Sequence, residues 1–334
     1  MRAAQAPVPA PHSRHQRLMP TKKTAHTPPP LHASRPAGAA ALAAALAARA
    51  QRDAAVRGVT SIAAMRDAIR DAARCLPPLH EVARVARPDG AAFRARAARG
   101  LPFLVTGLVP RWPLFSMTAQ TLRAEYGELP VRARVGDYID TAFAPDRAMQ
   151  DMSLAAYLEI AMDPSMDAAA RGDTGTRPAL PPYLGNLELR ALNRLCHWPT
   201  WFDKMGPPRF WLGPAGTVTP LHCDYDDNIF AQVWGTKRII LAPPHHDAFL
   251  YPKEANAILA GSPFDPEAPD FARYPLARQA SLVECIVAPG EMLYVPAGWY
   301  HQVRALTLSL SSNRWARAMP LALGDGAALR RALP

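Results

Sequence analysis

The sequence predicts a mainly β protein with flanking α-helices, in which helical N-terminal elements precede a jelly-roll (double-stranded β-helix) core. From residue 209 onwards the chain reads as eight short strand-like segments, most of them bounded by Gly, Pro or Asp. Segments with helical spacing come before them. Helices followed by many short antiparallel strands indicate a helix-decorated β-sandwich or barrel, and the jelly roll is the natural closed form of that architecture.

The leading segment differs in composition from the rest of the chain. Residues 1–36 contain eight Pro and no apolar periodicity, which predicts disorder. Residues 37–50 (AGAAALAAALAARA) are helix-prone, and the Ala-Arg-Ala before Gln51 mimics the cleavage site of an export signal. The apolar stretch is nearly all Ala and begins late in the chain, so we expect no export and a cytoplasmic location.

Helical elements are expected in the middle of the chain. Asp89 is placed to cap a short helix that runs through Arg99 and is followed by Gly100, a residue typical of helix C-termini. Periodicity and turn residues then predict, in order, a strand at 101–109, a Pro-Arg-Trp-Pro turn at 110–113, a helix at 118–126, a strand at 131–135 and a helix at 153–162.

The second half of the chain is predicted to be strands and turns. The expected strands are 209–212, 218–224, 229–234, 238–242, 283–287, 292–295, 301–304 and 307–312. Together these changes divide the chain into a basic Pro/Ala-rich tail at 1–75, largely disordered or loosely helical, a folded domain at 76–315 with its jelly-roll core at about 205–315, and a short extension at 316–334.

The net charge of +10 is not spread over the whole chain. Residues 1–75 hold 12 Lys and Arg against three acidic residues, whereas the remainder holds 26 basic and 25 acidic residues. The body of the protein is therefore nearly neutral and has no general electrostatic reason to bind a phosphate backbone.

Cysteine usage and hydropathy exclude further classes. The four Cys show neither CxxC spacing nor the density of a small disulfide-rich domain, which argues against a disulfide scaffold and a zinc ribbon and fits a reducing compartment. The longest apolar runs are too short to span a bilayer, so no membrane partner is expected.

One motif indicates metal chemistry. His222 and Asp224 are two residues apart, and on a strand this spacing places both side chains on one face. The best candidate for a third ligand is His301, because the turn in residues 289–300 leads directly into it. Two imidazoles and one carboxylate on one side of a metal suit Fe(II) in oxygenases. Taken alone, a His-x-Asp pair is also common by chance, and a buried His is often only hydrogen-bonded.

The surrounding residues resemble, in order and spacing, the jumonji-C (cupin-like) family of Fe(II)/2-oxoglutarate-dependent oxygenases. The likeness is greatest to its small hydroxylase branch, of the asparaginyl hydroxylase and tRNA wybutosine hydroxylase type. It covers about residues 80–315, and it is carried by blocks at 218–224, 228–244 and 289–301, with support from 265–278 and 107–113. Several independent blocks agree, so the resemblance is specific.

The resemblance implies a role for further side chains. His222, Asp224 and His301 would be the ligands of Fe(II). Lys237, 15 residues beyond His222, stands where the family places the lysine that binds the distal carboxylate of the cosubstrate 2-oxoglutarate. A dianion that enters a barrel needs such a cation. The residues expected to line the rest of this site are Thr219 and Tyr183 at the distal carboxylate, Asn228 and Asn313 at the metal side, and Trp315 at the pocket wall.

Two other cations compete with Lys237 for the carboxylate. Arg238 follows it directly, and a slip of one residue in strand register would exchange the two. Arg314 follows the second histidine, as does the arginine anchor of other oxygenases. Alternation favours Lys237 only if the register is right.

The resemblance implies a dioxygenase that converts 2-oxoglutarate and O2 to succinate and CO2 while it hydroxylates a carbon of its substrate. A protein, peptide or amino-acid side chain is the preferred substrate, because the body lacks a nucleic-acid footprint. Alternatives are a tRNA-modifying or N-demethylating oxygenase of the same family and a non-catalytic cupin that binds a small ligand. The oligomeric state stays open, with a homodimer among the options.

Overall fold

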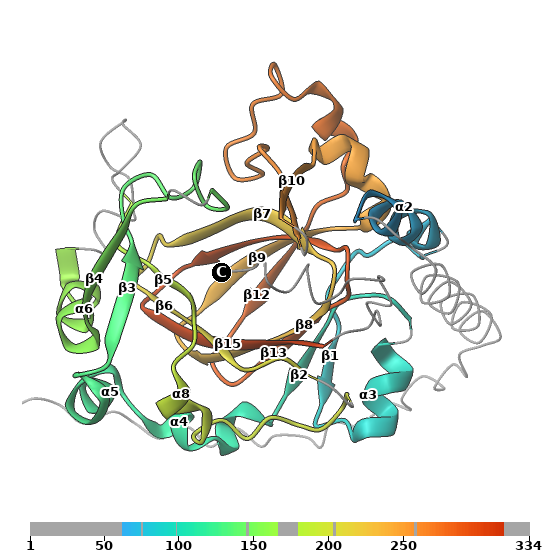
Figure 1. Cartoon of the computed structure of the whole chain (residues 1–334). Coiled ribbons are helices and arrows are strands. Elements are labelled where there is room, and N and C mark those ends of the chain that lie inside the picture. Colours follow the sequence, from blue (N-terminus) through green and yellow to red (C-terminus); the bar gives the residue numbers. More distant parts are fainter. Residues whose placement is uncertain are drawn as a thin grey trace, which may run out of the picture.

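Two β-sheets form a barrel at the centre of the protein, and helices cover its lower and left-hand sides in Figure 1. The computed structural model describes residues 62–74, 76–97, 99–144, 147–165, 180–202, 205–256 and 259–316. Most of the predicted tail, residues 1–61, and the extension beyond residue 316 lie outside this range.

The barrel consists of the eight strands that the sequence predicts. Four antiparallel neighbours in the order β13-β8-β15-β6 form one sheet, and β7-β14-β9-β12 form the other. The bounds are β6 Arg209–Gly213, β7 Val218–Asp224, β8 Asp227–Trp234, β9 Lys237–Ala242, β12 Val283–Val287, β13 Met292–Val295, β14 Tyr300–Ala305 and β15 Ser309–Ala316. The prediction of a mainly β fold with a double-stranded β-helix core is confirmed.

Shorter strands extend both sheets at their edges. The first sheet continues through β2 (Phe103–Thr106) to β1 (Arg84–Ala86) on one side and to β5 (Leu184–Leu187) on the other. The second sheet continues from β7 through β11 (Leu259–Gly261) to β10 (Lys253–Asn256). A separate hairpin pairs β3 (Pro130–Arg134) with β4 (Met149–Ser153).

Side-chain caps begin three of the described helices. Asp89 accepts a hydrogen bond from the backbone of Ala92 at the start of α3, and Thr118 forms a capping box with Thr121 at the start of α5. At the start of α6, the side chain of Ser153 accepts a hydrogen bond from the backbone N–H of Ala156. The helices after the first are α3 Gly90–Ala97, η1 Val109–Arg111, α4 Pro113–Ser116, α5 Ala119–Tyr126, α6 Leu154–Ala161, α8 Arg190–Asn193, η2 Pro244–Leu250 and η3 Pro275–Gln279.

The first described helix, α2 (Ile62–Ala73), packs against the barrel although it precedes the predicted domain boundary. Ile69 is 2% exposed and lies in the hydrophobic cluster that contains Tyr300. Arg66 and Arg70 form ion pairs of 3.6 and 3.9 Å with the buried carboxylate of Asp247 in η2. The predicted tail therefore ends in a packed helix, because these side chains find partners that are distant in the sequence.

Replacing Ile69 with Ala is expected to destabilise the protein. The change removes a buried side chain and leaves a cavity between α2 and the loop before β14, so the free energy of unfolding should fall by about 2–4 kcal/mol. Chemical denaturation of the full chain measures this value. Leu276→Ala is the control, since Leu276 is 43% exposed. An equal loss in both variants would contradict the close packing of α2.

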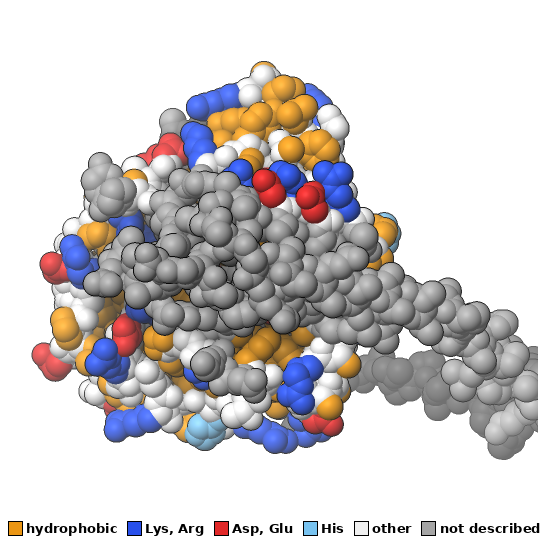
Figure 2. Space-filling view, turned by 45° about the vertical axis from the view of Figure 1, so that its right-hand side comes forward, with side chains coloured by type: hydrophobic (Ala, Val, Ile, Leu, Met, Phe, Trp, Pro, Cys, Tyr) orange, Lys and Arg blue, Asp and Glu red, His pale blue; other side chains and the backbone are white. Residues whose placement is uncertain are grey.

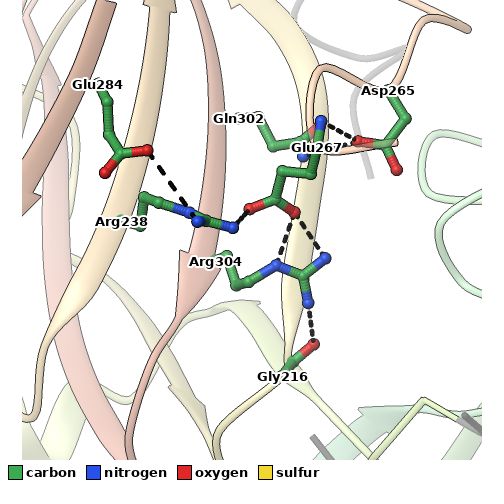
Figure 3. A network of polar contacts seen from close by, with 7 residues as sticks. All are labelled: Gly216, Arg238, Asp265, Glu267, Glu284, Gln302 and Arg304. Atoms are coloured by element: carbon green, nitrogen blue, oxygen red, sulfur yellow. Dashed lines mark hydrogen bonds and ion pairs between the residues drawn. The ribbon is translucent and has the colours of Figure 1, made fainter. Parts of the chain in front are cut away.

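A polar network holds the long connection between β11 and β12 against the outside of the second sheet (Figure 3). Glu267 in this connection accepts hydrogen bonds from Arg238 on β9 and Arg304 on β14. The side-chain amide of Gln302 donates to Asp265 at 3.1 Å. The network places Arg238 on the outer face of the barrel, where it also lies 4.0 Å from Glu284.

The described surface carries both signs of charge. On the face shown in Figure 2, Lys and Arg side chains are interspersed with Asp and Glu, in keeping with the near-neutral body expected from the sequence. No helix within the described ranges combines the length and the apolar character needed to cross a bilayer.

Candidate metal centre

Three potential metal ligands from two neighbouring strands meet inside the barrel. His222 and Asp224 lie on β7, and His301 lies on β14 directly opposite His222 in the antiparallel register. The two imidazole rings are 4.2 Å apart between centroids, and His301 Nε2 lies 3.8 Å from Asp224 Oδ2. Ligand atoms of all three lie within 4.8 Å of one another, and all three residues are buried. The predicted convergence of these side chains is therefore present.

Backbone carbonyls orient both imidazoles. His222 Nδ1 donates to the carbonyl of Pro220 at 2.8 Å, and His301 Nδ1 donates to the carbonyl of Trp299 at 3.1 Å. With the proton on Nδ1, each Nε2 keeps a lone pair that can coordinate a metal. Burial, followed by the neighbouring His301, lowers the pKa of His222 to about 4, so its ring is neutral at physiological pH.

The carboxylate of Asp224 is held by a chain of side-chain hydrogen bonds. Trp315 Nε1 donates to Oδ2 at 2.8 Å, and Asn228 Nδ2 donates to the same oxygen at 3.4 Å. Asn313 Nδ2 donates to Asn228 Oδ1 at 3.0 Å, and Trp211 Nε1 donates to Asn313 Oδ1 at 2.8 Å. The two amides thus lie beside the metal ligands, and Trp315 contacts the carboxylate itself. Sequence reasoning did not identify Trp211, which enters the site only through the pairing of β6 with β15.

A β-bulge brings Thr219 to the same side as His222. Along the β7–β14 pair, His301 lies opposite His222 and Val303 lies opposite Thr219, so three steps on β7 match two steps on β14. Pro220 lies in this bulge, where a residue without an N–H is tolerated. The hydroxyl of Thr219 is hydrogen-bonded to that of Tyr183, and both residues are buried.

Lys237 is a buried cation inside the barrel, with 1% of its surface exposed. Its Nζ donates to Ser311 Oγ at 2.8 Å and lies 5.3 Å from the ring of Phe230 and 6.0 Å from that of Tyr183. Burial lowers its pKa to about 7. No carboxylate pairs with this ammonium group among the described residues, which makes the position attractive to an anionic ligand.

The competing arginines are engaged elsewhere. Arg238 belongs to the outer network of Figure 3, so the register places Lys237 inward and Arg238 outward. Arg314 donates through Nε to the carbonyl of Gly206 at 2.7 Å and through Nη2 to that of Met205 at 3.2 Å. Its neighbours Asn313 and Trp315, on the other face of β15, are the ones that contact the site.

A cavity of about 550 Å³ lies beside β7, with Val218 and Pro220 in its wall. Phe143 lines it, and the ring of Phe143 is also 5.3 Å from that of His222. The cavity is otherwise bounded by the β11–β12 connection, β14 and the segment 139–144, with acidic, basic and aromatic side chains in its walls. None of the three candidate ligands lines it, whereas Gln302 and Asp265 of the network in Figure 3 do.

The donor set fits a divalent iron ion. Two imidazole nitrogens and one carboxylate oxygen lie within 4.8 Å of one another, and this donor set is typical of non-haem Fe(II) oxygenases. Their outer partners are present as well, namely the backbone carbonyls at both rings and the donors at Asp224.

Comparison with known proteins places this site in a family. A family model described as a cupin-like domain matches residues 90–320 of the chain. The match includes all eight barrel strands and the three candidate ligands.

Several known proteins are similar in sequence to part of this chain. Lysine-specific demethylase JMJ30 of Arabidopsis thaliana is 46% identical over 133 residues, which cover 40% of this chain and 27% of that protein. Lysine-specific demethylase 8 of Xenopus tropicalis is 43% identical over 105 residues, covering 31% of this chain and 24% of that protein. The human bifunctional peptidase and (3S)-lysyl hydroxylase JMJD7 is 28% identical over 249 residues, covering 64% of this chain and 76% of that protein. The match thus spans about a quarter of each demethylase.

Proposed function

The chain belongs to the cupin-like domain family, and from this membership we propose that it is an Fe(II)- and 2-oxoglutarate-dependent oxygenase that hydroxylates a protein, peptide or amino-acid side chain. The observation that carries the proposal is the buried convergence of His222, Asp224 and His301, with both imidazoles turned so that Nε2 is free to coordinate. The likeness of this chain to the asparaginyl hydroxylase and tRNA wybutosine hydroxylase branch stays a prediction.

Each part of the site has a task under this proposal. His222, Asp224 and His301 would hold the iron. With 2-oxoglutarate and O2, that metal would supply the oxidising chemistry for a substrate C–H bond, with succinate and CO2 as coproducts. Lys237 donates a charge-assisted hydrogen bond to the distal carboxylate of 2-oxoglutarate. Thr219 and Tyr183 add hydroxyl donors beside it. Burial of these groups excludes water, which strengthens the interaction with the dianion.

The names of the relatives support a polypeptide substrate. Two are called lysine-specific demethylases and one a lysyl hydroxylase. N-demethylation begins with hydroxylation of the methyl carbon, so it is the second candidate for the outcome. Mass spectrometry of a modified substrate separates the two, because hydroxylation adds one oxygen atom and demethylation removes one CH2.

Anaerobic titration followed by exposure to O2 tests the proposed function. The full chain is expected to bind one Fe(II) and 2-oxoglutarate together and then to release succinate when peptide pools are added. Binding without succinate from peptide, tRNA or metabolite pools would identify a non-catalytic binding protein instead. Stimulation by tRNA alone would identify an RNA-modifying oxygenase.

The affinity for 2-oxoglutarate is expected to depend on pH through Lys237. Its pKa of about 7 in the empty pocket means that the cationic form, which binds the dianion, predominates below pH 7 and is lost above it. The Kd for 2-oxoglutarate should therefore rise by about twentyfold between pH 6.5 and pH 8.5. His222 stays neutral throughout this window, since its pKa is about 4.

Anaerobic titrations of the metal-loaded protein at constant ionic strength measure this dependence. Lys237→Arg is the matched variant, because a guanidinium stays charged over the whole range and should give a flat profile. A flat profile in the unaltered protein would contradict the assignment of Lys237.

A further inference from the structure

A second buried cation, Arg134, lies beside the proposed 2-oxoglutarate pocket. It ends strand β3, and its backbone pairs with that of Tyr183 through hydrogen bonds of 2.8 and 3.0 Å. Only 5% of Arg134 is exposed. Figure 1 shows β3 running next to β5 and β6, at the side of the barrel. Arg134 thus approaches the site from outside the eight barrel strands, and the proposed reaction does not use it.

The guanidinium is enclosed by rings that belong to the site. Its Cζ lies 5.8 Å from the ring of Tyr183 and 5.7 Å from that of Trp211. Tyr183 is hydrogen-bonded to Thr219, and Trp211 is hydrogen-bonded to Asn313. On one side the group packs against Gly185, where a Cβ would come within 2.9 Å of Cζ. A glycine at this position leaves room for the arginine.

Two of the three nitrogens of this guanidinium lack acceptors among the described residues. Nε and Nη1 are fully enclosed, and neither has a hydrogen-bond acceptor among the described residues. Buried donors without acceptors are costly and therefore rare, and an unpaired buried charge is costlier still. A ligand that carries an acceptor would satisfy these donors.

The electrostatic surroundings indicate an anionic ligand. Burial lowers the pKa of Arg134, the nearby Arg147 lowers it further, and no carboxylate is among the groups that act on it. Asp224 offsets one charge of a divalent metal, and 2-oxoglutarate offsets two more. With Lys237 and Arg134 both charged, one positive charge stays uncompensated.

We propose that Arg134 binds a carboxylate of the substrate, so that the protein hydroxylates a peptide at or next to an acidic group. This inference rests on the proposed function and names the substrate class of the same site. A guanidinium offers two parallel N–H donors that match a carboxylate, and its burial makes the pair strong and selective. The carboxylate comes from an Asp or Glu side chain or from the C-terminus of the peptide, and both sources present the same group to Arg134.

Succinate release with matched peptide pools tests the proposal and separates the two sources. One pool contains Asp and Glu and is amidated at its C-terminus, the second contains Asn and Gln and ends in a free carboxylate, and the third contains Asn and Gln and is amidated. We expect the first or the second pool to raise succinate release above the third by about tenfold or more. Equal stimulation by all three pools, or none by the two acidic ones, would overturn the proposal.

Variants of the arginine then link the preference to this side chain. Arg134→Gln should abolish the advantage of the acidic pool, Arg134→Lys should keep part of it, and Arg134→Glu should favour a fourth, Lys-rich pool. Arg132→Gln is the matched control, because Arg132 lies two residues earlier on β3, is exposed and pairs with the exposed Asp151 at 2.7 Å. An acidic preference that survives in Arg134→Gln would show that another residue reads the carboxylate and would overturn the proposal.

Two readouts keep the proposal distinct from the proposed function. Absence of joint Fe(II) and 2-oxoglutarate binding would remove the proposed function, whereas normal binding with no acidic preference would remove only the role of Arg134. If Arg134→Gln weakens 2-oxoglutarate binding as much as Lys237→Ala does, Arg134 is a cosubstrate anchor and the proposal is wrong. The pool preference of the unaltered protein needs no variant, so it decides even where a variant fails to fold.

Discussion

Replacing Asp224 or His222 with Ala is expected to abolish succinate formation. Each change removes one of the three ligands, and the two that are left are too few to hold the metal. Loss of an outer hydrogen-bond partner alone typically lowers metal affinity by about 10- to 100-fold, so loss of a ligand should lower it by more. The Asp224 change also removes the only negative charge of the donor set and the acceptor of Trp315. Anaerobic Fe(II) titration and a succinate assay measure both effects.

Cys223→Ala is the matched control for this experiment. Cys223 lies between the two ligands on β7, but its side chain belongs to the hydrophobic cluster of Tyr300 and Leu221 rather than to the site. Metal affinity and succinate formation should therefore persist in this variant. Full activity in His222→Ala would remove the proposed mechanism, because no other described group could replace that imidazole in the cluster.

Replacing Lys237 with Ala is expected to weaken 2-oxoglutarate binding strongly while leaving the metal site in place. Removing one partner of a buried, hydrogen-bonded charge pair costs about 2–5 kcal/mol, which corresponds to a rise in Kd of about thirtyfold or more. Fe(II) affinity should change little, because Lys237 bonds to Ser311 and makes no recorded contact with the three ligands. At saturating 2-oxoglutarate, turnover should recover in part.

Stability separates a binding role of Lys237 from a structural one. Its ammonium group is buried without a carboxylate partner in the described part of the chain, and burial opposes the charged form. Lys237→Met should therefore leave the Tm of the protein without 2-oxoglutarate unchanged or higher. Arg238→Ala, one residue further on the outer face, is the control and should leave 2-oxoglutarate binding as it was. A fall in Tm with unchanged 2-oxoglutarate affinity would show that Lys237 serves the fold alone.

The barrel strands were predictable because each carries its own local signals. All eight expected strands are present, with ends shifted by a few residues, as at β15, which begins at Ser309 and continues to Ala316. The helix start at Asp89 followed from its side-chain chemistry, and the helices at 118–126 and 153–162 followed from periodicity. The short edge strands β1, β5, β10 and β11 were not predicted, since three or four residues carry too little pattern and pairing with a neighbour defines them.

The convergence of His222, Asp224 and His301 and most of the groups around them were expected through the family resemblance, whereas Trp211 and Arg134 were not. His222 and Asp224 share a face through simple alternation, but Thr219 lies three residues from His222 and joins that face only through the bulge at Pro220. Lys237 points inward because of the strand register. The ion pair of its neighbour Arg238 with Glu267 on the outer face shows that register. The residues next to Trp211 and Arg134 in the sequence do not predict their positions at the site. Their contacts are with rings and amides that other strands contribute.

By itself the sequence determined the eight barrel strands, several helices and the fold class, because local rules of alternation, capping and turn chemistry act over a few residues. The histidine–aspartate–histidine set was expected from strand alternation together with the resemblance to a known family. Only the tertiary structure decided which arginines face solvent, that helix α2 packs on the barrel, and that Arg134 is buried beside the pocket without an acceptor among the described residues. Burial and electrostatic pairing depend on distances between residues far apart in the chain, and folding alone sets those distances.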